Sequence, residues 1–440
     1  MTFASLPMIL FILPVIVIAA ALVPRQFRQD VLALGGLAAV CMTGGFPALT
    51  LLLVSVCGTW LLMRFQPQKT KEHHRRAEFR LYVSVFAQAV LVLLGRLMLT
   101  DLQLLPLLFC SLQATECLSE YANNRLSVPA LHSYFCFQCD LTRLPAGTVR
   151  SYPEAEAAFH AQKFTAENVG QGASWFIRGL FQLVCLSLPM YTLQNTITAA
   201  AGSRTAADAV LLAVCFCFYL YFALKGTARM GQGIAKMLGI DLPDSFDDPL
   251  LADSLQDFRR RFLTPLHAWT ERVLLNGHKS LDAAGYFSRM ALLLCGVGFV
   301  LGRGAGGFLW GILFAGLLTA EHTRQPHLHN VPVQARRILT VLLLLLTSGL
   351  LCSSSIFDCF SFYRSLLGIN GVFLSDTVWY LLRTNWLPLL LCLCGLIPVH
   401  QLHPPKGKIP QLLLGFCSAA AELFMLLAAY SELLSRYFRS

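Results

Sequence analysis

Charged side chains are scarce in this sequence. Asp, Glu, Lys and Arg together make up 13% of the 440 residues, about half of their usual share in a soluble globular domain. Hydrophobic residues make up 56%, more than a soluble fold of this length can hide from water. The lack of charge therefore excludes an ordinary soluble protein and indicates that lipid surrounds much of the chain.

The sequence features of a secretory signal and of an inverted-repeat transporter are also missing. The first apolar segment, 5–24, has no basic residues before it and no small-residue cleavage site after it. We interpret it as a membrane span that stays in the protein and not as a secretory signal. No internal repeat is visible, which weakens the prediction of a transporter built from two inverted halves.

Acidic residues are fewer than basic ones, 24 against 34, so the net charge is +10. The most basic segment, 64–80, has no aromatic residues spaced for base stacking, so we expect no nucleic-acid partner. The positive-inside rule accounts for it as a cytoplasmic loop. The protein is accordingly predicted to be a multi-pass protein of the cell membrane, in contact with membrane lipid.

Paired metal-binding motifs are absent. Most of the 15 cysteines lie inside apolar runs, where cysteine behaves as a small hydrophobic residue. Cys136 and Cys139 form an isolated CxxC without a second pair. We therefore expect no metal site, no disulfide and no bound cofactor.

What the sequence has in abundance is apolar segments of near-membrane length. A helix needs about 20 apolar residues to span a bilayer. The candidates are 5–24, 31–46, 47–63, 81–99, 103–119, 172–192, 206–225, 284–301, 306–321, 337–352, 386–400 and 411–430. They predict an all-α polytopic membrane protein with about ten to twelve transmembrane helices. The more polar stretches, about 120–170 and 226–282, are interpreted as short re-entrant and interfacial helices around a central cavity.

One polar stretch shows a clear helical period. In 254–275 the apolar residues recur at steps of three and four, which predicts an amphipathic helix interrupted or started near Pro265. By periodicity alone this is a helix at the cytoplasmic interface, with its arginines among the lipid headgroups.

The segment 219–262 carries a more specific pattern, "YLYFALKGTARMGQGIAKMLGIDLPDSFDDPLLADSLQDFRRRF". It resembles the membrane-bound O-acyltransferases, in particular the branch of the alginate O-acetyltransferases and the D-alanyl transfer proteins of teichoic acid synthesis. The matching residues are Tyr221, Phe222, Gly226, Met230, Gly233, Gly239, Leu242, Pro243, Phe246, Pro249, Ser254, Asp257, Phe258, Arg260 and Arg261. The segments 140–159, 308–316 and 356–371 resemble further family segments in the same order.

The resemblance implies an organisation and an activity. It places a family core in 81–330 of a single membrane domain 1–440, after N-terminal spans and a basic loop in 1–80 and before C-terminal spans in 331–440. The implied reaction moves an acetyl or D-alanyl group from an acyl thioester, acyl-CoA or an acyl carrier protein, to a hydroxyl of a cell-envelope polymer or lipid. An extracytoplasmic acyl-accepting protein or polymer is an implied partner. Asp257, Arg260, Arg261, Tyr221 and Trp310 are the implied substrate-binding residues.

The sequence departs from the family at its two histidine positions. The family's "WHG" reads Gly302-Arg303-Gly304 here, and the histidine that ends "WRRWH" is Leu263. Arginine cannot accept a proton, although it can hold an oxyanion, phosphate or carboxylate. Arg303 is also interpreted more simply as a snorkelling residue in a glycine-rich turn between two spans.

Two histidines are candidate substitutes for the lost base. His267 lies four residues after Leu263, and His322 follows Glu321, which could orient its imidazole. For each of them an interfacial histidine without a catalytic role is the simpler interpretation. Three hypotheses stay open: an acyltransferase that uses His267, His322 and Arg303; a family member that has lost the chemistry and serves as a binding or scaffold component; and, less favoured, a transporter.

Overall fold

The computed structural model is built from α-helices joined by short 3-10 and π-helical segments. It describes residues 12–65, 74–99, 103–144, 147, 149–162, 164–199, 204–275, 282–302, 304–328, 332–369, 373–396 and 408–437. Among these residues the one β-type contact is an isolated antiparallel bridge between Phe246 and Phe262. The predicted all-α fold is confirmed.

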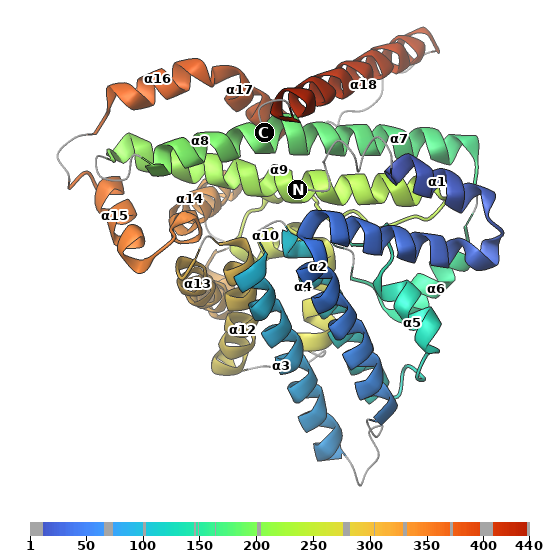
Figure 1. Ribbon diagram of the computed structural model, residues 1–440. Coiled ribbons are helices and arrows are strands. Elements are labelled where there is room, and N and C mark those ends of the chain that lie inside the picture. The colour runs from blue at the N-terminus through green and yellow to red at the C-terminus, as the bar shows by residue number, and fades with distance from the viewer. Residues whose placement is uncertain are drawn as a thin grey trace. The chain divides into compact units, whose positions relative to one another are not determined.

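Figure 1 shows the helices and labels them where there is room. Their bounds are α1 Leu13–Leu22, α2 Arg28–Phe65, α3 His74–Met98, α4 Leu105–Ala122, α5 Leu131–Gln138, α6 Tyr152–His160, α7 Ala166–Phe181, α8 Leu188–Ala199, α9 Ala206–Met237, α10 Leu255–Arg261, α11 Thr264–Trp269, α12 Ala283–Leu301, α13 Gly306–Leu328, α14 Val333–Cys352, α15 Ile356–Leu366, α16 Asp376–Thr384, α17 Trp386–Gly395 and α18 Lys408–Tyr437. Two π-helical segments, Gln182–Ser187 and Thr270–Leu274, continue α7 and α11.

Six helical stretches in the described part of the chain are long and apolar enough to cross a membrane. They are Arg28–Phe65, Ala166–Ala199, Ala206–Met237, Ala283–Leu301, Val333–Cys352 and Cys417–Arg436. The helices α16 and α17, bent by 65° at their junction, make a seventh if they form one broken span. The chain is thus a multi-pass membrane protein, with fewer full-length spans in these ranges than the ten to twelve predicted.

Part of this difference comes from α2, which unites the predicted spans 31–46 and 47–63. The break between them is a kink at Gly45, where φ is 68° and ψ is −164°. Glycine adopts this backbone conformation without a steric penalty. Pro47 follows and lacks the N–H that a continuous helix would use. Two predicted spans are therefore one kinked helix of 38 residues.

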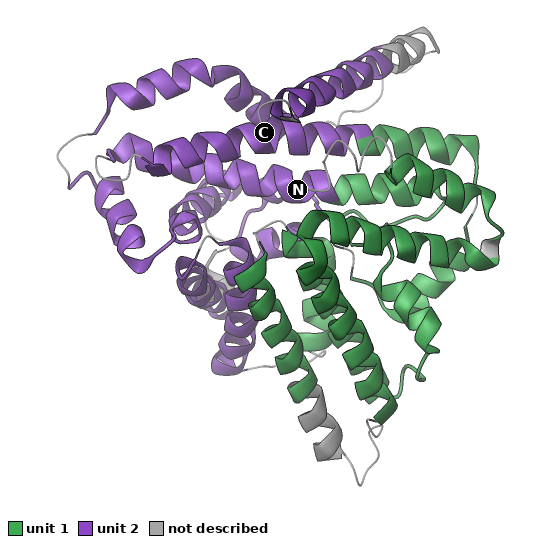
Figure 2. Ribbon diagram, in the orientation of Figure 1, with its two compact units in different colours: residues 1–176, 228–245, 263–279 green, residues 177–227, 246–262, 280–440 purple. Residues whose placement is uncertain are grey.

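The chain forms two compact units, shown in two colours in Figure 2. Unit 1 consists of residues 1–176, 228–245 and 263–279, and unit 2 of residues 177–227, 246–262 and 280–440. Segments far apart in the sequence therefore meet within each unit. The predicted segments 1–80, 81–330 and 331–440 follow other boundaries and stay a prediction.

In unit 1, helix α2 packs against α4 and α5. The backbone N–H of Leu141, just after α5, donates to the carbonyl oxygen of Leu32 at 3.2 Å. A Cβ atom at Gly36 would lie 1.8 Å from the carbonyl oxygen of Cys139, so the two backbones can approach this closely only at a glycine. These contacts fix the C-terminal end of α5 against α2.

In unit 2, helices α12 and α13 form a closely packed hairpin, and α14 packs against α13. A Cβ atom at Gly307 would lie 2.1 Å from the carbonyl oxygen of Gly298, and one at Gly311 would lie 2.4 Å from the backbone nitrogen of Cys295. Small residues let membrane helices approach in this way. The hairpin therefore depends on contact between backbones.

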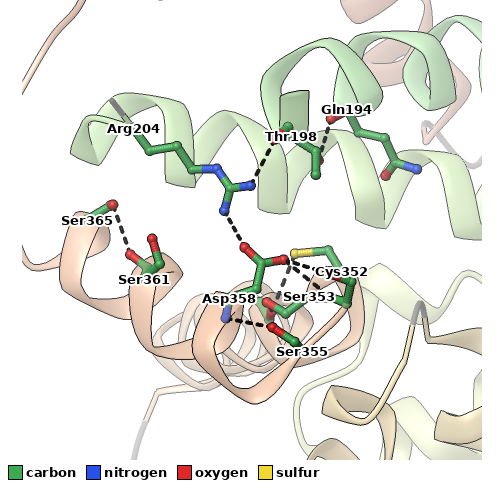
Figure 3. A network of polar contacts seen from close by, with 11 residues as sticks. Gln194, Thr198, Arg204, Cys352, Ser353, Ser355, Asp358, Ser361 and Ser365 are labelled. Carbon is green, nitrogen blue, oxygen red and sulfur yellow. Dashed lines mark hydrogen bonds and ion pairs between the residues drawn. The ribbon is translucent and has the colours of Figure 1, made fainter. Parts of the chain in front are cut away.

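Figure 3 shows how unit 2 pairs a buried charge. Arg204, whose side chain is 2% exposed, donates from Nη1 to Oδ1 of Asp358 at 3.0 Å and from Nη2 to the carbonyl oxygen of Thr198 at 3.3 Å. The other carboxylate oxygen of Asp358 accepts from the backbone N–H of Ser354 at 3.2 Å. A charge in an apolar environment requires such partners. The ion pair between Arg204 and Asp358 connects the start of α15 to the segment before α9.

Candidate functional site

Helix α10, the "SLQDFRRR" segment of the family-like motif, is short because both of its ends are fixed. At its start, the Ser254 hydroxyl accepts a hydrogen bond from the backbone N–H of Asp257 at 3.0 Å, as an N-cap residue does. At its end, Phe262 is extended and Leu263 has a left-handed φ of 53°. The predicted amphipathic helix over 254–275 is therefore interrupted, two residues before Pro265.

Asp257, Arg260 and Arg261 form one ion network on α10. The carboxylate of Asp257 accepts from Nη2 of Arg260 at 2.9 Å and from Nε of Arg261 at 2.8 Å. Arg261 also lies 3.8 Å from a carboxylate oxygen of Asp247. The structure brings these three predicted substrate-binding residues together. It also shows that the two guanidinium groups form ion pairs with the carboxylate of Asp257.

Tyr221 reaches the same region through a series of aromatic rings. Its ring lies 5.8 Å from that of Phe246, which lies 5.3 Å from Phe262, which in turn stacks on Phe258 of α10 at 5.2 Å. The Tyr221 hydroxyl accepts from the buried ammonium group of Lys225 at 2.6 Å. The aromatic series holds α9 and α10 together, and it explains why the motif contains these phenylalanines.

His322 lies near α10, and the carboxylate of its neighbour Glu321 is directed at that helix. The Glu321 carboxylate accepts from the backbone N–H groups of Leu255 at 2.9 Å and Gln256 at 3.2 Å, and so caps α10. The exposed imidazole of His322 stacks on Tyr286, with the ring centres 4.6 Å apart. A carboxylate that caps a neighbouring helix does not position this imidazole.

Trp310 belongs to the packing of the α12–α13 hairpin. Its ring stacks on Phe314 at 4.9 Å and lies against Gly298. It is twelve residues before His322 on α13, which corresponds to about 18 Å along a helix. The structure therefore does not bring Trp310 close to the residues of α13 that contact α10.

Arg303 lies outside the described residues, but the glycines around it do not. Helix α12 ends at Leu301 and α13 begins at Gly306, as the predicted spans 284–301 and 306–321 require. A Cβ atom at Gly304 would lie 2.1 Å from the carbonyl oxygen of Ser354, and one at Gly306 would lie 2.1 Å from that of Leu350. The short turn between the two helices agrees with the sequence interpretation, and the glycines at 304 and 306 also allow close packing against the segment at 350–354.

His267 lies in unit 1, on α11, and pairs with a carboxylate on the same helix face. Its Nδ1 atom is 3.8 Å from Oε1 of Glu271, one turn further along the helical stretch. The imidazole is half-buried. Many general bases are histidines with a carboxylate on the Nδ1 side of the ring, and Glu271 occupies that side of His267 at a distance longer than a hydrogen bond.

The stretch that carries His267 is anchored to α4. The indole N–H of Trp269 donates to the carbonyl oxygen of Leu112 at 2.9 Å. Arg272 donates from Nε to Oε1 of Glu116 at 2.7 Å, and Glu116 is 1% exposed. Arg272 also donates from Nη2 to the carbonyl oxygen of Val149 at 3.5 Å. These contacts connect the His267 region to the 140–159 segment of the family-like pattern.

Unit 1 also holds a cavity of about 280 Å³. Its lining residues come from α5, α6, the loop between them and two neighbouring segments: Gln26, Gln29, Leu32, Ser133, Cys136, Phe137, Asp140, Thr142, Arg143, Arg150, Tyr152, Ala155, Glu156, Ala158, Phe159, His160, Gln162, Ile240 and Leu242. The segment with Ile240 and Leu242 continues to Ser245, whose carbonyl oxygen accepts from the N–H of Thr264 in α11 at 3.0 Å. The wall of the cavity and α11 are thus joined through the backbone.

The cavity wall holds two arginines. Arg143 is 6% exposed and stacks over Phe137 at 4.5 Å. Its Nη2 atom has no hydrogen-bond partner among the described residues. Burial lowers the pKa of Arg143 and raises the pKa of Asp140, because both lose water around their charges. Arg150 donates to the carbonyl oxygen of Asp241 at 3.2 Å.

Sequence reasoning did not assign this cavity. The available signal was three charged residues, Asp140, Arg143 and Arg150, within eleven positions of a largely apolar chain. They coincide with the segment that resembles a family loop. The motifs alone did not indicate that α2 and the segment at Ile240 close the same cavity.

The comparisons with known proteins agree with the motifs. No family model matches the chain. The chain is 25% identical over 178 residues to a probable alginate O-acetylase AlgI of Pseudomonas aeruginosa, covering 39% of this chain and 34% of that protein. It is 27% identical over 200 residues to a peptidoglycan O-acetyltransferase of Helicobacter pylori, covering 44% of this chain and 38% of that protein. The probable alginate O-acetylase AlgI of Azotobacter vinelandii is 24% identical over 169 residues, covering 38% and 34%.

The chain therefore spans about a third of the length of the curated relatives it matches. The helical membrane fold and these relatives define an O-acetyltransferase-like membrane protein. These relatives confirm the resemblance to the membrane-bound O-acyltransferases that the motifs carry, as that of a divergent relative at about 25% identity.

Proposed function

We propose that the protein is a cell-membrane enzyme that transfers an acyl group, of acetyl or D-alanyl type, from a thioester donor to a hydroxyl of a cell-envelope polymer or lipid. The names of the relatives, an alginate O-acetylase and a peptidoglycan O-acetyltransferase, support a polysaccharide-like hydroxyl acceptor. The single observation that carries the catalytic part is the pairing of His267 with Glu271, 3.8 Å apart.

His267 is proposed as the general base. With Glu271 on its Nδ1 side, Nε2 takes the proton of the acceptor hydroxyl, and the oxygen attacks the thioester carbonyl carbon. The carbon–sulfur bond then breaks, and the leaving thiolate takes the proton back from the imidazolium. A separation of 3.8 Å exceeds a hydrogen bond, and catalytic contacts of this kind often tighten only when substrate binds.

Arg303 is proposed as the group that stabilises the oxyanion of the tetrahedral intermediate. This assignment is based on the sequence, because Arg303 occupies the family's "WHG" position and lies outside the described residues. A guanidinium can hold a developing negative charge without accepting a proton, so this role suits arginine where a base does not.

The unit 1 cavity is proposed to bind the donor. Acyl-CoA and the phosphopantetheine arm of an acyl carrier protein both carry phosphate, and Arg143 offers a buried guanidinium for such a group. An acyl carrier protein and an extracytoplasmic acyl-accepting protein or polymer are the partners that this proposal implies.

The test uses the full chain, purified in detergent and reconstituted into lipid vesicles, with acetyl-CoA labelled in its acetyl group and an alginate or peptidoglycan fragment as acceptor. We expect His267→Ala to lower the transfer rate by about 100-fold or more and Glu271→Gln to lower it less. His322→Ala and its neighbour Thr323→Ala serve as controls, because Thr323 bonds only to carbonyl groups of its own helix. The fraction of folded protein is measured for each variant.

Two outcomes overturn the assignment. Loss of transfer in His322→Ala with normal transfer in His267→Ala would move the base to α13. No labelled product with acetyl or D-alanyl thioesters would instead favour the scaffold hypothesis, which the replacement of both family histidines by Leu263 and Arg303 supports.

A further inference from the structure

Three potential metal ligands meet in unit 1 where α5 packs on the start of α2. His132 Nε2 lies 2.7 Å from Asp30 Oδ1, and Cys136 Sγ lies 3.3 Å from the same oxygen. The Sγ and Nε2 atoms are 3.9 Å apart. All three ligand atoms lie within 4.8 Å of one another.

The backbone around this cluster is fixed independently of the three side chains. His132 and Cys136 are four residues apart on α5, so they lie on one face of the helix. Asp30 is in the first turn of α2. The hydrogen bond from Leu141 to Leu32 and the contact of Gly36 with Cys139 hold the two helices in register. A metal would therefore find its ligands already gathered.

The distances fit a tetrahedral metal ion. Zn²⁺ binds sulfur, nitrogen and oxygen at about 2.0–2.3 Å, which keeps neighbouring ligand atoms about 3.3–3.6 Å apart. The observed separations of 2.7, 3.3 and 3.9 Å lie below, at the lower edge of and above this range, so small side-chain rotations suffice. A set of one thiolate, one imidazole and one carboxylate is chemistry that Zn²⁺ accepts.

We propose that Asp30, His132 and Cys136 form a binding site for a zinc-type divalent cation, with a fourth position open to water or another ligand. On binding, the metal replaces the proton of the Cys136 thiol, which passes to solvent. The side chain of His132 is 71% exposed, which gives the ion a path of entry. Cys136 also lines the cavity described above, so the ion would stabilise one wall of that cavity.

The sequence prediction of no metal site considered Cys136 only together with Cys139. The structure shows why that pairing misled. Cys136 faces Asp30, which is 106 positions away in the chain, whereas Cys139 is fully buried. The competing explanation is a metal-free trio, in which Asp30 simply accepts hydrogen bonds from the imidazole and the thiol.

The variant Cys136→Ser separates the two explanations, because serine keeps a hydrogen-bond donor for Asp30 but loses the soft thiolate ligand. The full chain is purified in detergent, stripped of metals with a chelator and titrated with Zn²⁺, and with Co²⁺ as a spectroscopic probe. We expect one ion per chain and a thiolate-to-cobalt absorption band. Cys136→Ser and His132→Ala should weaken binding at least about tenfold. Cys57→Ser, which changes an exposed cysteine outside the cluster, should leave binding unchanged.

Thermal unfolding adds an independent measurement. Zn²⁺ should raise the melting temperature of the wild-type chain, because binding to the folded state stabilises it, and should not do so in His132→Ala. Since His132 is largely exposed, this variant should fold normally. Binding that is substoichiometric in the wild type, or equally tight in Cys136→Ser, would overturn the proposal and leave the hydrogen-bonded trio.

Discussion

The carboxylate of Glu321 caps the first turn of α10, accepting from the backbone N–H of Leu255 at 2.9 Å. Helix α10 is only seven residues long, and an isolated helix of this length is unstable in water. Its position therefore depends on α13, which carries Glu321. Sixty-six positions separate the two residues in the chain.

We expect Glu321→Ala to lower the free energy of unfolding by about 1–3 kcal/mol, because it leaves two backbone donors without their charged acceptor. Glu321→Gln keeps one acceptor oxygen and should cost less. Unfolding by heat in detergent, monitored by intrinsic fluorescence, measures both. Thr323→Ala, two residues away, is the control. Equal stability of Glu321→Ala and the wild type would show that α10 does not need this cap.

The buried Glu116 makes a second prediction possible. Arg272→Met removes its charged partner and should lower the free energy of unfolding by roughly 1–3 kcal/mol. This is less than for a fully buried pair, because the Arg272 side chain is 40% exposed. The double variant Glu116→Gln/Arg272→Met removes the unpaired charge and should recover much of the loss. A double variant that is less stable than Arg272→Met alone would contradict this account.

The α12–α13 hairpin provides a matched pair of glycine variants. A Cβ atom at Gly307 would lie 2.1 Å from a backbone oxygen that cannot move away, whereas one at Gly296, on α12, would meet nothing within 4 Å. We expect Gly307→Ala to destabilise the protein by about 3 kcal/mol and Gly296→Ala to stabilise it by up to about 1 kcal/mol. The melting temperatures of both variants are compared in the same detergent. Similar values for the two variants would refute the predicted difference.

The cavity leads to a kinetic prediction. If Arg143 holds the anionic part of the donor, Arg143→Met should raise the KM for acetyl-CoA about tenfold and change kcat little. Arg125→Met, which replaces an exposed arginine of unit 1 outside the cavity lining, should leave both constants unchanged. A fall in kcat at constant KM would instead place Arg143 in the chemical step.

The sequence predicted what is local. Helix α12 ends at Leu301 and α13 begins at Gly306, as predicted, because long apolar runs on either side of a glycine cluster leave few alternatives. The break in 254–275 was expected because Pro265 cannot continue a helix.

Contacts between distant segments were not predictable in the same way. The cap of Glu321 on α10, the pairing of Arg272 with Glu116 and the cluster around Asp30 each join residues 66 to 156 positions apart. Periodicity shows which face of a helix is apolar, but it does not show which other helix covers that face. Glu321 illustrates the limit, since its neighbour in sequence is His322 but its hydrogen-bonding partner is α10.

The backbone contacts of the α12–α13 hairpin have a consequence for how the chain enters the membrane. Gly298 and Gly302 on one side, and Gly307 and Gly311 on the other, each have the GxxxG spacing. Lipid tails solvate apolar side chains as well as a protein interior does, so the two helices gain from the fit of their bare backbones and not from the exclusion of water. We expect this hairpin to insert and associate as a unit during biogenesis, before the remaining helices of unit 2 assemble around it.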